Sequence, residues 1–103
     1  MNVVELPIKI HFGKIAAFCR ARGIRKLSLF GSVLRDDFNP ERSDVDVLAE
    51  FQPETQPGWE FFGWHEDLEP IIGGKVDLHT VNSLSKYFRE EVLREALPVY
   101  EQA

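Results

Sequence analysis

Two aspartates separated by a single valine begin a segment that otherwise has the composition of a buried β-strand. The segment is DVDVLAEF, residues 44–51, and the charged pair is Asp44 and Asp46. Because side chains two residues apart point to the same face of a strand, both carboxylates project together, while Val45 and Val47 face the other way. Neighbouring carboxylates repel each other and lose hydration when buried. The strand therefore either ends in solvent or has a positive charge beside this pair.

A third aspartate, Asp77, lies in a similar apolar segment, KVDLHTV, residues 75–81. If this strand and the strand at 44–51 are neighbours in one sheet, all three carboxylates meet on one sheet surface. Carboxylate oxygens are the ligands that Mg²⁺ prefers, and phosphate oxygens of a substrate commonly complete its coordination. The pattern therefore indicates a magnesium site for a nucleoside triphosphate, with solvated strand ends as the alternative explanation.

A glycine–serine pair, Gly31 and Ser32, follows the apolar run IRKLSLF at residues 24–30. Glycine allows a sharp turn and a close approach of the backbone to a ligand. A hydroxyl and free N–H groups at the start of a short helix suit a phosphate, so we expect Ser32 to cap a helical turn at residues 32–36. Arg35 is one turn further on and can contact the same phosphate. A simple turn followed by a solvated arginine is the alternative.

The remaining sequence alternates helical and extended patterns. Strands are expected at residues 24–30, 44–51 and 75–81. Helices are expected at about residues 8–22, 59–72 and 84–97, from apolar residues at helical spacing and from the positions of Pro7, Gly23, Gly73 and Pro98. Helices that alternate with strands predict the α/β (α+β) class, here a small mixed β-sheet with helices packed against it.

Length and charge narrow the functional classes. A chain of 103 residues is expected to form a single domain over residues 1–103. Its net charge of −5 argues against direct nucleic-acid binding, which needs a basic face, but not against a nucleotide held through a metal ion. One cysteine excludes an intramolecular disulfide, and no signal peptide or membrane-length apolar stretch is visible. We therefore expect a cytoplasmic location and no membrane partner.

The segments LFGSVLRDDFNPERSDVDVLAEF and GGKVDLHT together resemble the minimal nucleotidyltransferases of the polymerase-β superfamily. That family has a Gly-Ser pair, a loop, an Asp-x-Asp motif and a third aspartate in a later strand. The resemblance covers roughly residues 24–97 and implies the polymerase-β-like nucleotidyltransferase fold. The loop between Ser32 and Asp44 is one residue longer here than is usual in the family.

The resemblance also implies roles for individual residues. Gly31 and Ser32 would hold the triphosphate. Asp44 and Asp46 would bind both of two Mg²⁺ ions, and Asp77 would bind the catalytic ion and help to deprotonate the attacking hydroxyl. The three aspartates would thus be both metal ligands and catalytic residues.

Minimal nucleotidyltransferases of this kind are typically the antitoxin half of a toxin–antitoxin pair whose toxin is a helical HEPN-family ribonuclease. The resemblance implies transfer of AMP from ATP to a tyrosine hydroxyl of that toxin, with Mg²⁺ and release of pyrophosphate. One alternative is an antitoxin that neutralises the toxin by binding alone. Another is nucleotidyl transfer to a small molecule, although relatives with that activity usually carry a further helical domain.

Three other features have simpler explanations. His79 is two residues past Asp77 and can share its face, but a half-exposed histidine at a strand end is the simpler interpretation. Cys19 continues the apolar stripe of the first helix, so we expect it in the core. A group of aromatic residues is expected mainly in the core, with a partner-binding surface as the alternative. Its members are Trp59, Phe61, Phe62 and Trp64.

Overall fold

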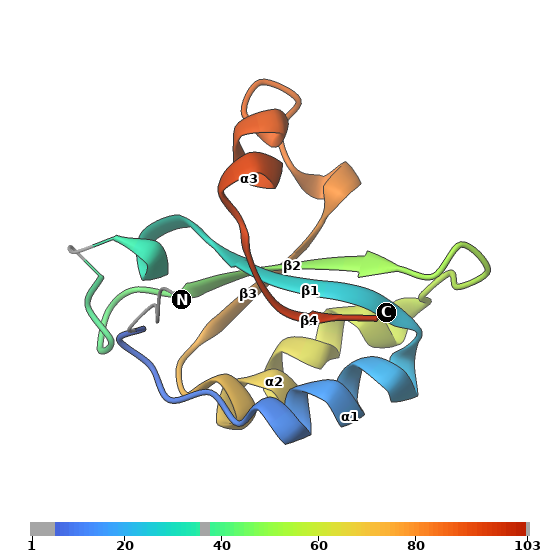
Figure 1. The fold of residues 1–103 in the computed structure, drawn as a ribbon, viewed down its shortest axis with the longest axis horizontal. Helices are drawn as coiled ribbons and strands as arrows, with labels where there is room; N and C mark the ends of the chain where they lie inside the picture. The colour runs from blue at the N-terminus through green and yellow to red at the C-terminus, as the bar shows by residue number, and fades with distance from the viewer. Residues whose placement is uncertain (1–5, 36–37, 103) are drawn as a thin grey trace.

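The computed structural model describes residues 6–35 and 38–102. Its four strands form one sheet in the order β3-β2-β1-β4 (Figure 1). The strands are β1 (Ile24–Phe30), β2 (Val45–Phe51), β3 (Val76–Thr80) and β4 (Leu97–Glu101). Strand β1 is antiparallel to both β2 and β4, whereas β2 and β3 are parallel. The expected mixed sheet is confirmed.

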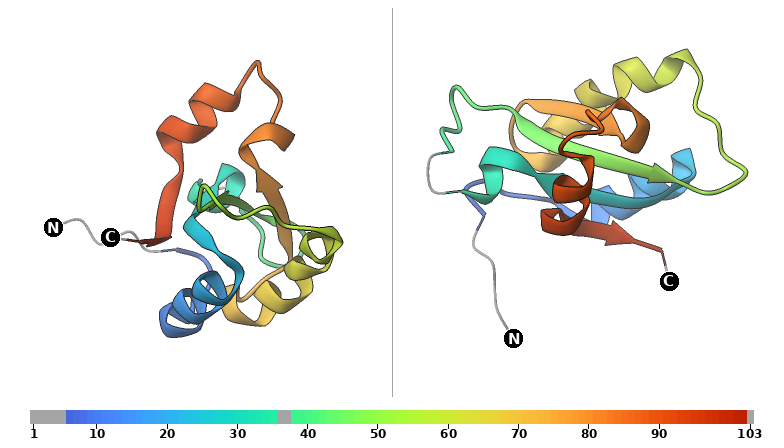
Figure 2. Two further views of the ribbon diagram at one scale, coloured as in Figure 1. Left: turned by 90° about the vertical axis from the view of Figure 1, so that its right-hand side faces the viewer. Right: turned by 90° about the horizontal axis from the view of Figure 1, so that it is seen from above.

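In the described part of the chain, three α-helices accompany the sheet: α1 (Phe12–Arg22), α2 (Trp64–Ile72) and α3 (Arg89–Glu95). Helices α1 and α2 cover one face, and α3 lies on the opposite side (Figures 1 and 2). Three short 3₁₀ segments, η1 (Gly31–Leu34), η2 (Trp59–Gly63) and η3 (Val81–Ser83), join these elements. Within the described residues, no helix has the length and apolar character needed to cross a membrane.

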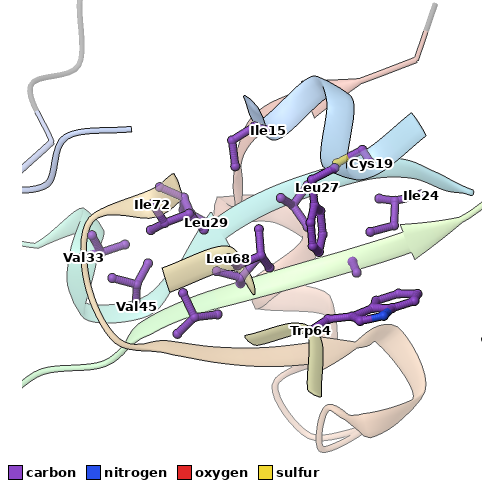
Figure 3. Close-up of a cluster of buried hydrophobic side chains, with 14 residues drawn as sticks. Ile15, Cys19, Ile24, Leu27, Leu29, Val33, Val45, Trp64, Leu68 and Ile72 are labelled. Carbon is purple, nitrogen blue, oxygen red and sulfur yellow. The ribbon is translucent and has the colours of Figure 1, made fainter. Parts of the chain in front are cut away.

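The main hydrophobic core lies between the sheet and the helices α1 and α2 (Figure 3). Alternation along β2 sends Val45, Val47 and Ala49 into this core, as the sequence pattern predicts. Leu48 points to the opposite face, where it joins Phe30 and Leu84 in a smaller apolar cluster near α3. Asp46 has the same parity as Leu48 and therefore lies on that second face, beside the smaller cluster.

Helix α1 begins four residues later than the sequence predicts. Residues 8–11 are not helical, and His11 is the N-cap, with its Nδ1 accepting a hydrogen bond from the Lys14 N–H at 3.3 Å. The His11 N–H donates to the carbonyl oxygen of Ile71 at 2.9 Å, so this segment satisfies a free carbonyl at the end of α2. A tertiary hydrogen bond thus replaces the first helical turn that Pro7 suggested.

The end of α1 agrees with the sequence prediction. Gly23 is the C-cap with φ of +70°, in the left-handed region that glycine adopts without strain, and its N–H donates to the carbonyl of Cys19. Cys19 is fully buried in the core, as expected. Burial raises the pKa of its thiol to about 12, against an opposing effect of the positive charge of Arg22. Cys19 is therefore a packing residue rather than a nucleophile.

The C-terminal prediction was partly wrong. The predicted helix at 84–97 is only α3, and the residues that follow Ala96 form strand β4, which pairs with β1. Pro98 sits in this edge strand at a register shift, where a residue without an N–H is tolerated. Pro98 favours the end of a helix, and it is the second residue of a strand that the sequence pattern does not predict.

The aromatic group is divided between core and surface. Trp64 is buried and Phe61 packs against the core, as predicted. Trp59 and Phe62 are 86% and 67% exposed, and their rings lie 5.7 Å apart. The predicted helix at 59–72 therefore begins as the 3₁₀ segment η2, which turns this aromatic pair to solvent, and becomes α-helical only at Trp64.

Candidate active site

The sheet register places the two central carboxylates side by side. Asp46 on β2 is opposite Asp77 on the parallel strand β3, and it is opposite Phe30 on β1. Residues on neighbouring strands at the same register lie about 5 Å apart in Cβ position. The expectation that the strands carrying these two aspartates are neighbours is therefore confirmed.

The Gly31 turn packs against the Asp46 carboxylate. Gly31 has φ of +76°, and a Cβ at this position would lie 2.5 Å from Asp46 Oδ2. Only a glycine fits this backbone conformation beside the carboxylate without displacing it. The turn therefore brings backbone and carboxylate together on the β1 side of the site.

Ser32 and Arg35 lie in and after this turn, but not with the capping geometry that the sequence suggests. Segment η1 starts at Gly31, and its N-cap is Phe30 without a side-chain hydrogen bond, so Ser32 is not the cap. Ser32 is half-buried, and its carbonyl accepts the Arg35 N–H at 2.9 Å. Arg35 is exposed. The end of the turn predicted at residue 36 lies outside the described residues.

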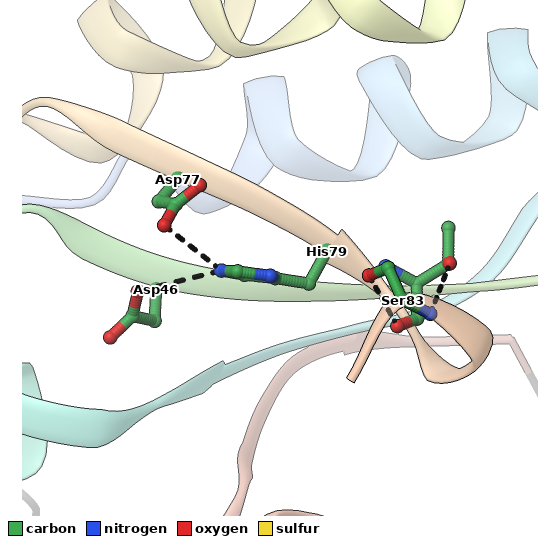
Figure 4. A network of polar contacts seen from close by, with 5 residues as sticks. Asp46, Asp77, His79 and Ser83 are labelled. Atoms are coloured by element: carbon green, nitrogen blue, oxygen red, sulfur yellow. Dashed lines mark hydrogen bonds and ion pairs between the residues drawn. The ribbon is translucent and has the colours of Figure 1, made fainter. Parts of the chain in front are cut away.

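His79 is the third member of the cluster. Its Nε2 lies 3.1 Å from Asp77 Oδ2 and 3.6 Å from Asp46 Oδ1, between the two carboxylates (Figure 4). This nitrogen is buried and has no partner with hydrogen-bond alignment in the described part of the chain. It is nevertheless within ion-pair distance of both carboxylates, so the nitrogen and the two oxygens converge on one point.

Packing positions the His79 ring. The ring of Phe30 meets it edge-on with centroids 5.3 Å apart, and Phe30 is itself held in the smaller apolar cluster with Leu48 and Leu84. The His79 side chain is 25% exposed, so its orientation depends on these neighbours rather than on solvent. The smaller apolar cluster thus fixes the position of the Phe30 ring, which in turn orients the His79 ring.

Asp44 remains outside this tight group. It directly precedes β2, is exposed, and is not among the residues whose ligand atoms lie within 4.8 Å of one another, namely Asp46, Asp77 and His79. The negative charge of Asp44 still contributes to raising the pKa of Asp46. Of the three aspartates singled out in the sequence, the structure brings two into contact range and leaves the third at the edge. His79, rather than Asp44, is the third residue of the cluster. The sequence signal for this was its position two residues after Asp77 in the same strand, which puts both side chains on one face.

The electrostatics of the cluster favour a bound cation. Burial raises the pKa of Asp46 above its ordinary value; the negative charges of Asp77 and Asp44 act in the same direction, and His79 opposes them. A raised carboxyl pKa means that the charged form is less stable here than in water. Two carboxylate oxygens and a buried nitrogen that lies between them therefore fit a divalent metal ion, which would supply the missing positive charge.

A pocket of about 420 Å³ runs along β3 beside this cluster. It is lined on one side by Asp77 and His79 and on the other by Phe61, Phe62 and His65. Strand β3 is at the edge of the sheet, so the pocket is open from outside. A larger hollow of about 570 Å³ lies elsewhere, around Gly23 and Tyr100, and none of the clustered residues lines it.

We expect Asp46→Asn to raise the melting temperature of the metal-free protein at pH 7. Because the pKa of Asp46 is raised in the folded state, this state binds more protons than the unfolded chain in the window above the ordinary carboxyl pKa, and its stability falls as pH rises through that window. Asparagine carries no charge at any pH, so the variant does not lose this part of the folding stability as the pH rises. The gain should therefore shrink as the pH is lowered toward about 3.9.

Thermal unfolding in EDTA, followed by circular dichroism at several pH values, measures this difference. In a domain of this size, a change of about 1 kcal/mol moves the melting temperature by roughly 4–8 °C. A variant that is less stable than the wild type at pH 7, or a gain that does not depend on pH, would contradict the electrostatic description of Asp46.

A family model for the nucleotidyltransferase domain matches residues 13–99. This match includes the turn, all three aspartates and His79, and it spans most of the chain. The chain therefore belongs to the nucleotidyltransferase domain family and is a nucleotidyltransferase.

Two relatives are similar in sequence over long stretches. A Methanocaldococcus jannaschii protein that is provisionally named a protein adenylyltransferase is 33% identical over 99 residues, which are 96% of this chain and 99% of the relative. The protein adenylyltransferase MntA of Thermococcus cleftensis is 38% identical over 77 residues, or 75% of this chain and 76% of the relative. The resemblance drawn from the motifs is confirmed.

Solved structures share the fold. One provisionally described as a minimal nucleotidyltransferase is 31% identical, with a TM-score of 0.66 over 84% of this chain and 87% of that one. A toxin–antitoxin structure with AMP-PNP has a TM-score of 0.68 at 19% identity, over 90% of this chain and 75% of that one. A complex of the tri-AMPylated Shewanella oneidensis HEPN toxin with its MNT antitoxin has a TM-score of 0.60 at 19% identity, over 88% and 70%. The expected nucleotidyltransferase fold is confirmed.

Proposed function

We propose that this chain is an antitoxin that transfers AMP from ATP to a tyrosine hydroxyl of a partner HEPN-family toxin, with Mg²⁺ and release of pyrophosphate. The observation that carries the proposal is the pairing of Asp46 with Asp77 across β2 and β3, with the Gly31 turn against Asp46. This combines a carboxylate pair for divalent ions with a backbone turn suited to phosphates.

The comparisons support the choice of AMP and of a protein acceptor. Of two relatives that are similar over long stretches, one is named a protein adenylyltransferase, at 38% identity, and the other is provisionally so named, at 33% identity. Solved structures with the same fold are described as an antitoxin bound to its toxin with an ATP analogue and as an antitoxin bound to an AMPylated HEPN toxin. A cytoplasmic location and a complex with a toxin would follow from this function.

In the proposed reaction, the tyrosine oxygen forms a bond to the α-phosphorus of ATP, and the bond from that phosphorus to the bridging oxygen of the leaving pyrophosphate breaks. Asp77 receives the tyrosine proton, directly or through water. Asp46, Asp77 and Asp44 would hold two divalent ions, which would neutralise the charge on the phosphates and make the hydroxyl more acidic. Gly31 and Ser32 bind the triphosphate through backbone N–H groups and the hydroxyl, and Arg35 contributes positive charge from the end of the turn.

The strand order supports binding of the ATP triphosphate and of the acceptor hydroxyl on different sides of Asp46. Gly31 follows β1, on one side of Asp46, whereas Asp77 lies on the edge strand β3, on the other side. The triphosphate therefore belongs on the Gly31 side and the acceptor hydroxyl on the Asp77 side. The pocket along β3 opens on that acceptor side, and its Phe61 and Phe62 walls suit an aromatic side chain such as tyrosine.

The direct test mixes the purified chain and MgATP with the HEPN-family toxin of its own gene pair and measures the intact mass of the toxin. We expect the toxin mass to increase by one AMP or a whole number of AMP units, and fragmentation to place the addition on tyrosine. Loss of the toxin's ribonuclease activity should follow the modification. A toxin that keeps its mass in the presence of the folded chain and MgATP would contradict the proposal.

A second candidate is neutralisation of the toxin by binding alone. The exposed aromatic pair Trp59 and Phe62 favours a protein-binding surface at this end of the molecule, because large apolar side chains in contact with each other are uncommon on free surfaces. The two candidates separate in a double variant, Asp46→Asn with Asp77→Asn. Neutralisation that survives in this variant, without a mass change in the toxin, would favour binding alone. Modification of the toxin would favour transfer to a protein over transfer to a small molecule.

A further inference from the structure

We propose that His79 is a direct nitrogen ligand of the divalent ion held by Asp46 and Asp77, and that it shifts the preference of this centre from Mg²⁺ toward Mn²⁺. The inference rests on the proposed function only for the position of the metal centre. It adds a ligand that the three-aspartate pattern does not contain. It also gives the chemical class of the preferred ion: a first-row transition metal rather than a purely oxygen-seeking one.

The first support is geometric. Ligands at about 2.1 Å from an octahedral ion and at right angles to each other are about 3.0 Å apart. His79 Nε2 is 3.1 Å from the nearer Asp77 oxygen and 3.6 Å from the nearer Asp46 oxygen, and all three ligand atoms lie within 4.8 Å of one another. These separations are close to those that one ion needs, so the cluster can close around an ion with small side-chain movements.

The second support is that the His79 nitrogen has no other partner. Nε2 is buried, points between the two carboxylates and forms no aligned hydrogen bond within the described residues. The Phe30 ring holds the imidazole in this direction. Its only contacts in the described part of the chain are thus the two carboxylates, and a cation between the three groups would bind the nitrogen and both oxygens at once.

The third support is ligand chemistry. Mg²⁺ takes oxygen ligands almost exclusively. Imidazole nitrogen suits first-row transition metals, and among these Mn²⁺ is the one that also prefers carboxylate oxygens, which two of the three ligands here supply. A centre of two carboxylates and one imidazole therefore gains affinity for Mn²⁺ from the histidine and gains little for Mg²⁺. His65 serves as the control histidine, because it borders the same pocket but contacts Glu69, at 3.5 Å, rather than the two aspartates.

The test measures metal binding without substrate, so it does not depend on whether the chain transfers AMP. Isothermal titration gives the Kd for Mn²⁺ and for Mg²⁺ in the wild type, in His79→Gln and in the control His65→Gln. We expect His79→Gln to weaken Mn²⁺ binding by about tenfold or more and Mg²⁺ binding by less than about threefold, in line with the loss of one metal ligand. His65→Gln should leave both values unchanged.

Electron spin-echo spectroscopy of the Mn²⁺-loaded protein adds a signature of direct ligation. A histidine nitrogen bound to Mn²⁺ couples to the electron spin, and this coupling should be present in the wild type and absent in His79→Gln. The chain has three histidines. If His79→Gln does not fold, retention of the coupling in both His11→Gln and His65→Gln assigns it to His79.

Two results would overturn the inference. One is a wild-type Mn²⁺ sample without histidine nitrogen coupling. The other is Mn²⁺ affinity that is unchanged or higher in His79→Gln, since a histidine that only balances the charge of the carboxylates competes with any cation. In that case its removal would improve the binding of Mg²⁺ and Mn²⁺ alike.

Discussion

Asp46→Asn is expected to lower the rate of AMP transfer by more than about 100-fold, because even the outer partners of metal ligands contribute 10–100-fold. Asp46 contacts the Gly31 turn on one side and pairs with Asp77 on the other, so its carboxylate belongs to both halves of the proposed site. Initial rates of labelled AMP incorporation into the toxin, at saturating MgATP, measure the effect.

The matched control for this charge removal is Asp67→Asn. Asp67 lies on α2, is 58% exposed and forms a surface ion pair with Arg22 at 3.3 Å. A surface ion pair of this kind contributes little to stability, so we expect a transfer rate within about twofold of the wild type. Asp46→Asn is expected to stabilise the metal-free fold, and thermal unfolding of the same samples shows whether loss of transfer occurs in a folded variant. An Asp46→Asn variant that retains more than about a tenth of the wild-type rate of AMP transfer would refute a direct role for Asp46.

The second large effect is expected at Gly31. In Gly31→Ala, a left-handed backbone conformation would carry a side chain, at a cost of roughly 1–2 kcal/mol, and the new Cβ would meet Asp46 Oδ2 at 2.5 Å. The carboxylate must move, which displaces a metal ligand as well as the phosphate turn. We expect transfer to fall by at least about tenfold, because even outer partners of metal ligands contribute that much. Rates and thermal unfolding are measured on the same samples.

Two other glycines separate backbone strain from damage to the site. Gly73 is the C-cap of α2 and has φ of +90°, and the three atoms nearest to an added Cβ all belong to the Lys9 backbone, the closest being its oxygen at 2.8 Å. Gly73→Ala should therefore lose at least as much stability as Gly31→Ala while keeping its transfer rate. Gly63 has open space around it, so Gly63→Ala should change neither quantity. Equal losses of transfer in Gly31→Ala and Gly73→Ala would mean that strain alone explains the effect.

The strands that carry the site were predictable because their signals are local. Alternation of apolar and charged residues predicted β2 to within one residue, and the end of β1 at Phe30 follows from the glycine after it. The side chains of Val45 and Val47 are buried as the pattern requires, which turns Asp46 to the opposite face. Period-two alternation depends only on the pleat of a strand and needs no knowledge of its neighbours.

The elements that were mispredicted depend on distant partners. Residues 8–11 are held in a non-helical form by the hydrogen bond from His11 to Ile71, which is sixty positions away in the sequence. The segment Leu97–Glu101 is a strand because β1 offers it a free edge, although Pro98 and the preceding helical pattern favour other states. Local propensity was overridden in both places by hydrogen bonds that only the folded chain supplies.

The amino-acid sequence by itself determined the class of this protein: the strand pattern, the glycine at the turn and the aspartates that mark a nucleotidyltransferase. Only the tertiary structure decided which side chains meet. The parallel register of β2 and β3 pairs Asp46 with Asp77, leaves Asp44 at the margin and brings His79 between the two carboxylates. The physical reason is that a residue's face is set by its own strand, whereas its neighbours are set by a register between segments about thirty residues apart.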